Sequence, residues 1–193
     1  MKIKTSEIVK RVFDLLDENE TLVDERVEYC DPDTAVKPLI MDLLPDAARL
    51  TLSTLPLSEI DETVKVKLKV EYEGTGVGKA RLPEDFLRLS YVRMTCWPYG
   101  ISDPLAFGGE EYRLRNGRKG LAARRRSSPA VAISSRGSEK DIHIFGISEG
   151  AGVDSFEYVA VPKISGIYIE LPPGTVSAVC SRLAGMVGDV IAG

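Results

Sequence analysis

Residues 63–70 read Thr-Val-Lys-Val-Lys-Leu-Lys-Val, and this stretch decides the fold class. From residue 64 onward every second position is apolar, and each position between them is a lysine. A period of two predicts a β-strand that turns one face to a core and the other to water. The apolar residues before this stretch recur instead at a spacing of three or four, so we expect a helical part followed by a β-rich part.

Two amphipathic helices are expected upstream of residue 63. The first is capped by Thr5 or Ser6 and ends near Asn19. The second begins at Asp31-Pro32, a capping carboxylate followed by proline, and continues with a broad apolar face for about five turns. Pro45 lies inside that face, so we expect it to kink or break the helix.

Downstream of residue 70, short apolar runs alternate with turn signals such as Asn116-Gly117. The strand candidates are residues 86–94, 111–115, 130–134, 141–147, 156–161 and 164–171. After Pro172-Pro173-Gly174, Thr175 can cap a last amphipathic helix. The small residues Gly185 and Gly188 favour close packing of this helix against another.

A single amphipathic helix cannot bury its own apolar face, so the helices from both ends of the chain are expected to pack together. The sequence therefore predicts an α+β fold. A small helical bundle comprises residues 1–62 and 174–193. A large antiparallel β-rich insertion, sandwich-like or barrel-like, comprises residues 63–173 and includes a long basic loop at about 113–128. The sequence has no targeting signal and no run of about 18 apolar residues, so we expect no membrane contact.

The formal net charge is −4 at pH 7, but charge is unevenly distributed along the chain. Residues 1–62 hold fifteen acidic and seven basic residues, whereas residues 112–138 hold eight basic residues and no acidic one. The candidates for subunit or DNA contact are Arg113, Arg115, Arg118, Lys119, Arg124, Arg125 and Arg126. Three interpretations stay open: a solvated loop, contact with nucleic-acid phosphates, and contact with the acidic end of a neighbouring copy.

Residues suited to catalysis or metal binding are scarce. The sole histidine, His143, excludes sites that need several histidine ligands, and Cys30, Cys96 and Cys180 lie far apart in the sequence. A Cys96–His143 nucleophile pair is compatible with the spacing, but a lone histidine in a strand more often has a structural role. The glycines within residues 74–78 do not open a helix, which a phosphate site requires. We expect no enzyme, no cofactor and no metal, and a reducing compartment.

Several landmarks follow one another along nearly the whole chain. The most specific is residues 82–89, which read Leu-Pro-Glu-Asp-Phe-Leu-Arg-Leu. The others are Asp46-Ala47-Ala48-Arg49-Leu50, Leu55-Pro56, Trp97, Pro129-Ala130-Val131-Ala132-Ile133 and Tyr158-Val159-Ala160-Val161-Pro162. In this order they resemble the head–tail adaptor proteins of tailed phages, including the tail tubular protein A family of short-tailed phages.

That resemblance implies a virion structural protein without catalytic residues, located at the head–tail junction after assembly in the host cytoplasm. About twelve copies would form a homo-oligomeric ring that binds the portal protein on one side and tail or nozzle proteins on the other. Genomic DNA would pass through the ring without sequence-specific contact. An alternative function, of a different kind, is a nucleic-acid-binding or regulatory module that uses the arginine-rich segment.

Overall fold

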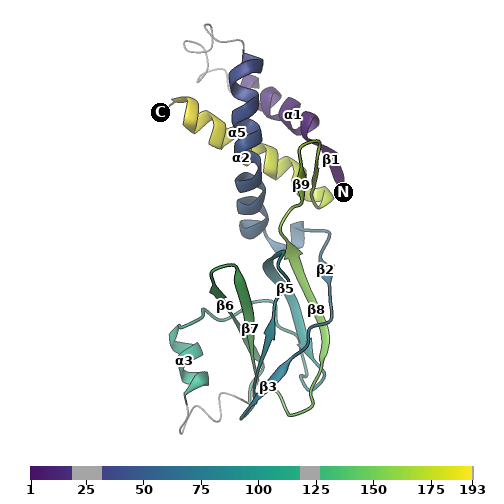
Figure 1. Ribbon diagram of the computed structural model, residues 1–193, viewed down its shortest axis with the longest axis vertical. Helices are drawn as coiled ribbons and strands as arrows, with labels where there is room; N and C mark the ends of the chain where they lie inside the picture. The colour runs from purple at the N-terminus through teal and green to yellow at the C-terminus, as the bar shows by residue number, and fades with distance from the viewer. Residues whose placement is uncertain (19–31, 118–126, 193) are drawn as a thin grey trace. The chain divides into compact units, whose positions relative to one another are not determined.

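The computed structural model describes residues 1–18, 32–117 and 127–192. Over these residues the expected α+β class is confirmed, with helices from both ends of the chain and a β-rich middle (Figure 1). The chain divides into two compact units. The helical unit comprises residues 1–62 and 161–193, and the β unit comprises residues 63–160. Residues 161–173, which we expected in the β-rich insertion, therefore belong to the helical unit.

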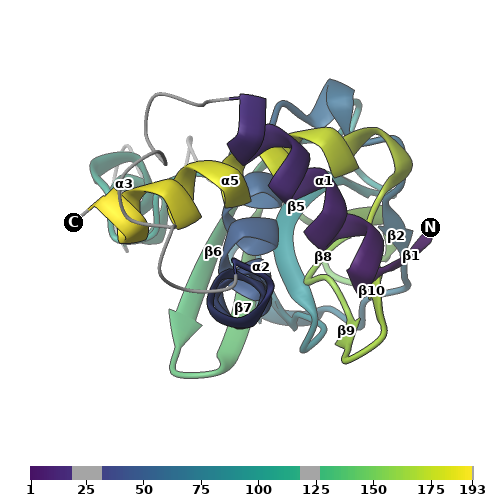
Figure 2. The same cartoon turned by 90° about the horizontal axis from the view of Figure 1, so that it is seen from above.

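Three helices form the core of the helical unit: α1 (Thr5–Glu18), α2 (Pro32–Thr54) and α5 (Val176–Ala192). Helix α5 packs against both of the others, and Figure 2 shows α1 and α5 side by side. The residues that lose all exposure to solvent come from each helix and include Ile8, Val12, Ile40, Leu44, Val179, Leu183 and Val187. These are the apolar positions whose spacing predicted the helices, so burial of one face explains why both chain ends meet.

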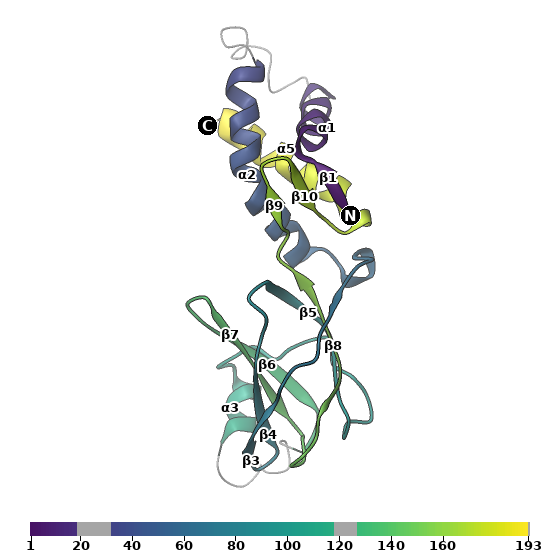
Figure 3. The same cartoon turned by 45° about the vertical axis from the view of Figure 1, so that its right-hand side comes forward.

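A small antiparallel sheet completes the helical unit. Its strands β1 (Lys2–Lys4), β10 (Tyr168–Glu170) and β9 (Ile164–Ser165) lie in that order, as Figure 3 shows. Ile3 and Ile169 form a cross-strand pair and are both buried. The Thr5 backbone N–H donates a hydrogen bond to the Ile167 carbonyl at 2.9 Å, which joins the start of α1 to the turn between β9 and β10.

Helix α2 is continuous through both of its internal prolines, Pro38 and Pro45, so of the kink or break expected at Pro45 the break does not occur. Both proline rings lie on the exposed side of the helix, opposite the buried Ile40 and Leu44. On that side water can bind the carbonyl that loses its helical partner, which reduces the cost of an internal proline. The helix ends at Thr54, and a short 3₁₀ turn, η2 (Leu57–Glu59), follows Pro56.

Helix α5 follows a second 3₁₀ turn, η3 (Pro173–Thr175), where the Thr175 hydroxyl donates to the Pro172 carbonyl at 2.9 Å. The expected close packing through its glycines is not found, because no atom from elsewhere in the described residues lies within 4 Å of the Cβ position of Gly185 or Gly188. The helix packs instead through its larger apolar side chains.

By length and composition alone, residues 173–191 are the one stretch of the described chain that could cross a membrane, but Val179 and Leu183 are wholly buried in the helical unit.

Two antiparallel sheets form the β unit. One contains β2 (Val64–Lys65), β8 (Val153–Ala160) and β5 (Phe86–Met94) in that order. The other contains β3 (Glu71–Gly74), β4 (Val77–Arg81), β7 (Glu139–Phe145) and β6 (Ala130–Arg136) in that order. Short turns join β3 to β4 and β6 to β7, so these two pairs are hairpins.

The core of the β unit draws side chains from both sheets. Val92 and Phe156 contribute from the first sheet, and Val131, Ile142 and Ile144 contribute from the second. All five are buried, and they belong to one continuous apolar cluster. In β7 and β8 alternate residues point into this cluster, as a period of two predicts, whereas bulges in β5 space its core residues Phe86, Leu89 and Val92 three apart. The arrangement is that of a sandwich, in which two sheets bury their inner faces against one another.

Two expected strands differ in the structure. Residues 111–115, expected as a strand, form part of the short helix α3 (Glu110–Asn116). Residues 64–70, expected as one strand, pair only at Val64 and Lys65, and residues 66–70 continue without a partner strand in the described chain. The remaining strand candidates all correspond to strands, although residues 164–171 form two short strands rather than one.

The glycines within residues 74–78 have two separate structural roles. Gly74, Thr75 and Gly76 have positive φ angles of 89°, 55° and 81°, which the tight β3–β4 turn requires. Gly78 lies in β4, where a Cβ atom would be 2.8 Å from the Cγ1 atom of Val70. These glycines thus form a hairpin rather than open a helix.

Candidate interaction surfaces

The structure places only two of the seven basic site candidates. Arg113 and Arg115 lie in helix α3. The other five, Arg118, Lys119, Arg124, Arg125 and Arg126, lie outside the described residues. The two described arginines therefore belong to a helix and not to the loop that the sequence suggested.

The two arginines of α3 differ in their surroundings. The Arg115 Nε atom donates to Glu111 at 3.0 Å, and its Nη1 atom donates to the Ser128 carbonyl at 2.8 Å. Only 12% of the Arg115 side chain is exposed, so it joins α3 to the residues that precede β6. The Arg113 side chain is exposed and has no ion pair within the described chain. Of this pair, Arg113 is the one available to a partner.

Helix α3 is attached to the second sheet through aromatic side chains. Tyr112 is buried, and its ring meets the ring of Phe145 edge-on at a centroid distance of 5.9 Å. The Phe107 ring lies 4.6 Å from the Tyr112 ring and is 50% exposed. Phe107 thus offers an exposed aromatic ring beside α3, and aromatic residues and arginine are enriched in protein interfaces.

His143 lies beneath these rings. Its Nε2 atom is 3.1 Å from the hydroxyl oxygen of Ser134, and its ring lies 5.2 Å from the Phe107 ring. Burial, together with the charge of Lys79, lowers the pKa of His143 below its ordinary value. The ring is therefore neutral at pH 7, so it can pack among the aromatic rings without desolvating a charge.

A serine–histidine contact is half of a nucleophilic triad, so its surroundings decide what it can do chemically. Asp141 lies on the same face of β7, two residues from His143, but it forms ion pairs with Lys79 at 3.1 Å and Arg81 at 3.5 Å. Burial alone would raise the pKa of Asp141, but Lys79 and Arg81 lower it overall. In the described chain no carboxylate accepts a hydrogen bond from His143, so nothing orients the ring as a base.

Charged side chains cover the exposed end of the second sheet. Arg81 forms ion pairs with Glu139 at 2.5 Å and with Asp141, across the β4–β7 pair. These residues line an open pocket of about 480 Å³ together with Lys69, Glu71, Lys79 and Ala80. Positive and negative side chains are equal in number there, so the pocket does not favour a ligand of either charge.

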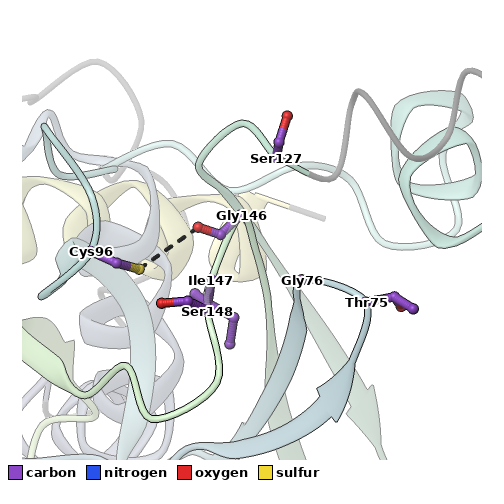
Figure 4. A pocket seen from close by; sticks show the side chains of 7 residues that line it. All are labelled: Thr75, Gly76, Cys96, Ser127, Gly146, Ile147 and Ser148. Carbon is purple, nitrogen blue, oxygen red and sulfur yellow. Dashed lines mark hydrogen bonds between the residues drawn. The ribbon is translucent and has the colours of Figure 1, made fainter.

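Cys96 lines a second open pocket, of about 370 Å³, together with Thr75, Gly76, Ser127, Gly146, Ile147 and Ser148 (Figure 4). Its sulfur lies 3.8 Å from the Gly146 carbonyl oxygen, which also accepts a hydrogen bond from the Trp97 indole at 2.8 Å. No contact joins Cys96 to His143, although both residues are described. The nucleophile pair that the spacing allowed is therefore not assembled in this structure.

The strongest electrostatic feature is the difference in charge between the two units. The helical unit contains seventeen acidic and nine basic residues, for a formal charge of −8. The β unit contains sixteen basic and twelve acidic residues, for a formal charge of +4. The sequence has an acidic end and a basic segment, and these fall within the residue ranges of different compact units. Two copies can therefore attract one another through unlike units.

No family model matches the chain, and no curated protein is detectably similar to it in sequence. Within the described residues no group of three or more histidine, cysteine, aspartate or glutamate side chains is placed to hold a metal ion. A function can therefore be inferred only from this chain's own surfaces and from the landmarks in its sequence.

Proposed function

We propose that this protein is a structural subunit of a tailed-phage virion, a head–tail connector that joins the portal to the tail in a homo-oligomeric ring. The observation that carries the proposal is the opposite formal charge of the two units, −8 for the helical unit and +4 for the β unit. A closed ring needs a contact between two different surfaces of one subunit, and unlike charge on separate units supplies such surfaces.

The order of sequence landmarks supports the same proposal. Residues 82–89 and the segment from Tyr158 to Pro162 are those that resemble head–tail adaptors. In this proposal about twelve copies form a ring that binds the portal protein and tail or nozzle proteins. Genomic DNA passes through the ring without sequence-specific contact, and the site of action is the head–tail junction of the virion.

The test is capture by a portal ring. The full chain is mixed at micromolar concentration with the portal protein encoded in the same genome, and the product is analysed by sedimentation velocity and electron microscopy. We expect a portal–connector complex with a ring of added density. We expect less of it as salt rises, because interactions between exposed charges more than about 10 Å apart are largely screened at 0.1 M salt. If neither portal nor tail proteins capture the chain at low salt, the proposal is wrong.

The alternative function, a nucleic-acid-binding or regulatory module, is tested with the same preparation. Binding to duplex and single-stranded DNA is measured for the full chain and for a variant in which Arg124, Arg125 and Arg126 are replaced by alanine. Tight binding that this variant loses, together with failure of portal capture, would favour the alternative. Portal capture by both proteins would favour the connector.

A further inference from the structure

The edge of the β unit between β2 and β3 has backbone groups that no other part of the described chain uses. Strand β2 is at the edge of one sheet and β3 is at the edge of the other, and residues 66–70 connect them (Figure 1). The Val66 N–H donates to the Phe156 carbonyl at 3.2 Å. Beyond it, no backbone hydrogen bond reaches Lys67, Leu68 or Lys69 from the described residues.

The side chains of this edge alternate as in a strand. Val66, Leu68 and Val70 are partly buried against the core of the β unit, whereas Lys67 and Lys69 are exposed. Because the Val66 amide points towards β8, the amide of Lys67 points to the opposite, open side of an extended chain. The segment therefore presents strand-like donors and acceptors beside an ordered apolar core.

Charge determines which strand can pair there. Lys65 forms an ion pair with Glu157 at 2.8 Å, but Lys67 and Lys69 have no ion pair in the described part of the chain. Two copies of this edge cannot pair with each other favourably, because lysines would face lysines. An acidic extended segment avoids this repulsion between lysines. Its side chains can pair with Lys67 and with Lys69, the second of which shares a pocket with both acidic and basic side chains.

The same chain contains a segment of that chemistry. Residues 19–31, which lie outside the described residues, hold five acidic residues and one arginine. Alternate positions within this segment carry β-branched or aromatic residues, namely Thr21, Val23, Val27 and Tyr29. Its sequence therefore combines strand propensity with the charge opposite to that of the edge.

We propose that the acidic segment 19–31 of a second copy of this chain adds as a strand to the open edge at residues 66–70. Main-chain hydrogen bonds to Lys67 and Lys69 supply the register, and the two lysine side chains select an acidic strand. This inference rests on the proposed function in one respect, because it names the contact between neighbouring subunits of the ring. It joins the acidic unit of one copy to the basic unit of the next.

The first test uses a fluorescent peptide of residues 20–31, with serine in place of Cys30 to prevent disulfide formation. Its binding to the full chain is measured by anisotropy. We expect binding that weakens about tenfold in the variant Lys67→Ala/Lys69→Ala, which keeps the backbone donors. We expect no binding in Lys67→Pro, which removes the unpaired backbone N–H of residue 67. We expect unchanged binding in Arg136→Ala, which removes one positive charge at the end of a different edge strand, β6.

A peptide of the same composition in scrambled order is the control for charge alone. Equal binding of the scrambled peptide would overturn strand addition. Equal binding to Lys67→Pro, with circular dichroism showing a folded protein, would overturn it as well. Portal capture is measured in parallel on each variant, so failure of the strand contact with capture intact would refute this inference and leave the connector proposal standing.

Amide hydrogen exchange at residues 67–69 of the full chain shows directly whether a strand pairs with this edge and which copy of the chain supplies it. Protection that increases with protein concentration supports addition from a second copy. Protection that is independent of concentration identifies the chain's own segment and overturns the inference. Rapid exchange at every concentration, together with no peptide binding, shows that the edge stays open and overturns it too.

Discussion

The Tyr158 hydroxyl donates a hydrogen bond to the Asp85 carboxylate at 2.8 Å. Asp85 immediately precedes β5 and Tyr158 lies in β8, so this bond joins two segments that are 73 positions apart in the sequence. The Phe86 ring packs against the Tyr158 ring at 5.7 Å. Burial, the hydrogen bond and the charge of Asp85 raise the pKa of Tyr158 to about 12. Two of the sequence landmarks, residues 82–89 and the segment from Tyr158 to Pro162, thus meet in one partly buried contact.

Replacing Tyr158 with phenylalanine removes this hydrogen bond and leaves the Asp85 carboxylate without its donor. We expect the free energy of unfolding to fall by about 1.5–3 kcal/mol, the usual range for hydrogen bonds to charged groups. Chemical denaturation measures this loss. Tyr168→Phe is the matched control, because Tyr168 is exposed in β10, and it is expected to change stability by less than about 0.5 kcal/mol. Equal losses in both variants would contradict a specific role for the Tyr158–Asp85 bond.

His143 is expected to make stability fall as the pH is lowered below about 7. Burial and the charge of Lys79 lower its pKa in the folded protein, so the unfolded chain binds the proton more readily. Stability is therefore fully present above the unfolded pKa of about 6.5 and is lost as pH falls through the lower folded pKa. Denaturation curves at several pH values should show this loss, and His143→Gln should flatten it. An unchanged slope in His143→Gln would contradict the assignment.

Gly78 is expected to tolerate no side chain. A Cβ atom there would collide with the Ile147 side chain and lie 2.8 Å from the Cγ1 atom of Val70. Gly78→Ala should therefore destabilise the protein by about 1–3 kcal/mol, the usual cost of overpacking a core. Gly152→Ala is the control, because no atom from elsewhere in the described residues lies within 4 Å of its Cβ position. Comparable melting temperatures of the two variants would show that the core around Gly78 can expand.

The two arginines of α3 should separate stability from interaction. Arg115→Ala removes the bonds to Glu111 and to the Ser128 carbonyl, so we expect a loss of about 1–3 kcal/mol in denaturation measurements. Arg113→Ala should change stability by less than about 0.5 kcal/mol, because its side chain is exposed. A large loss from Arg113→Ala would show a structural contact that the described residues do not contain.

The fold class could be predicted because the change of period at residue 63 is a local property of the sequence. The alternation of valine and lysine predicted a strand, and the apolar positions such as Ile40 and Leu183 correctly identified the face that each helix buries. The length of that strand could not be predicted, because pairing depends on a partner. Strand β2 loses its partner β8 after two residues, while the alternation of side chains continues.

Helix α3 and Pro45 show where pattern and structure diverge. Residues 108–116 begin with two glycines and two glutamates and include Arg113 and Arg115 in the last turn. Acidic residues in the first turn and basic residues in the last turn are favoured by the helix dipole. Seven residues are too few for a clear helical period, so the pattern of apolar residues favours a strand there. Pro45 is tolerated because its ring faces solvent, and only the packing of the neighbouring residues determines that orientation.

Because the β unit is a continuous insertion, the residues of the two units are complete at different moments of synthesis. Every strand of the β unit is translated before α5, so the sandwich has all of its residues before the helical unit does. The apolar faces of α1 and α2, with Ile8 and Leu44 at their centres, must wait for α5. The N-terminal helices therefore spend longest without their partner, and they are where a nascent-chain chaperone would have most to protect.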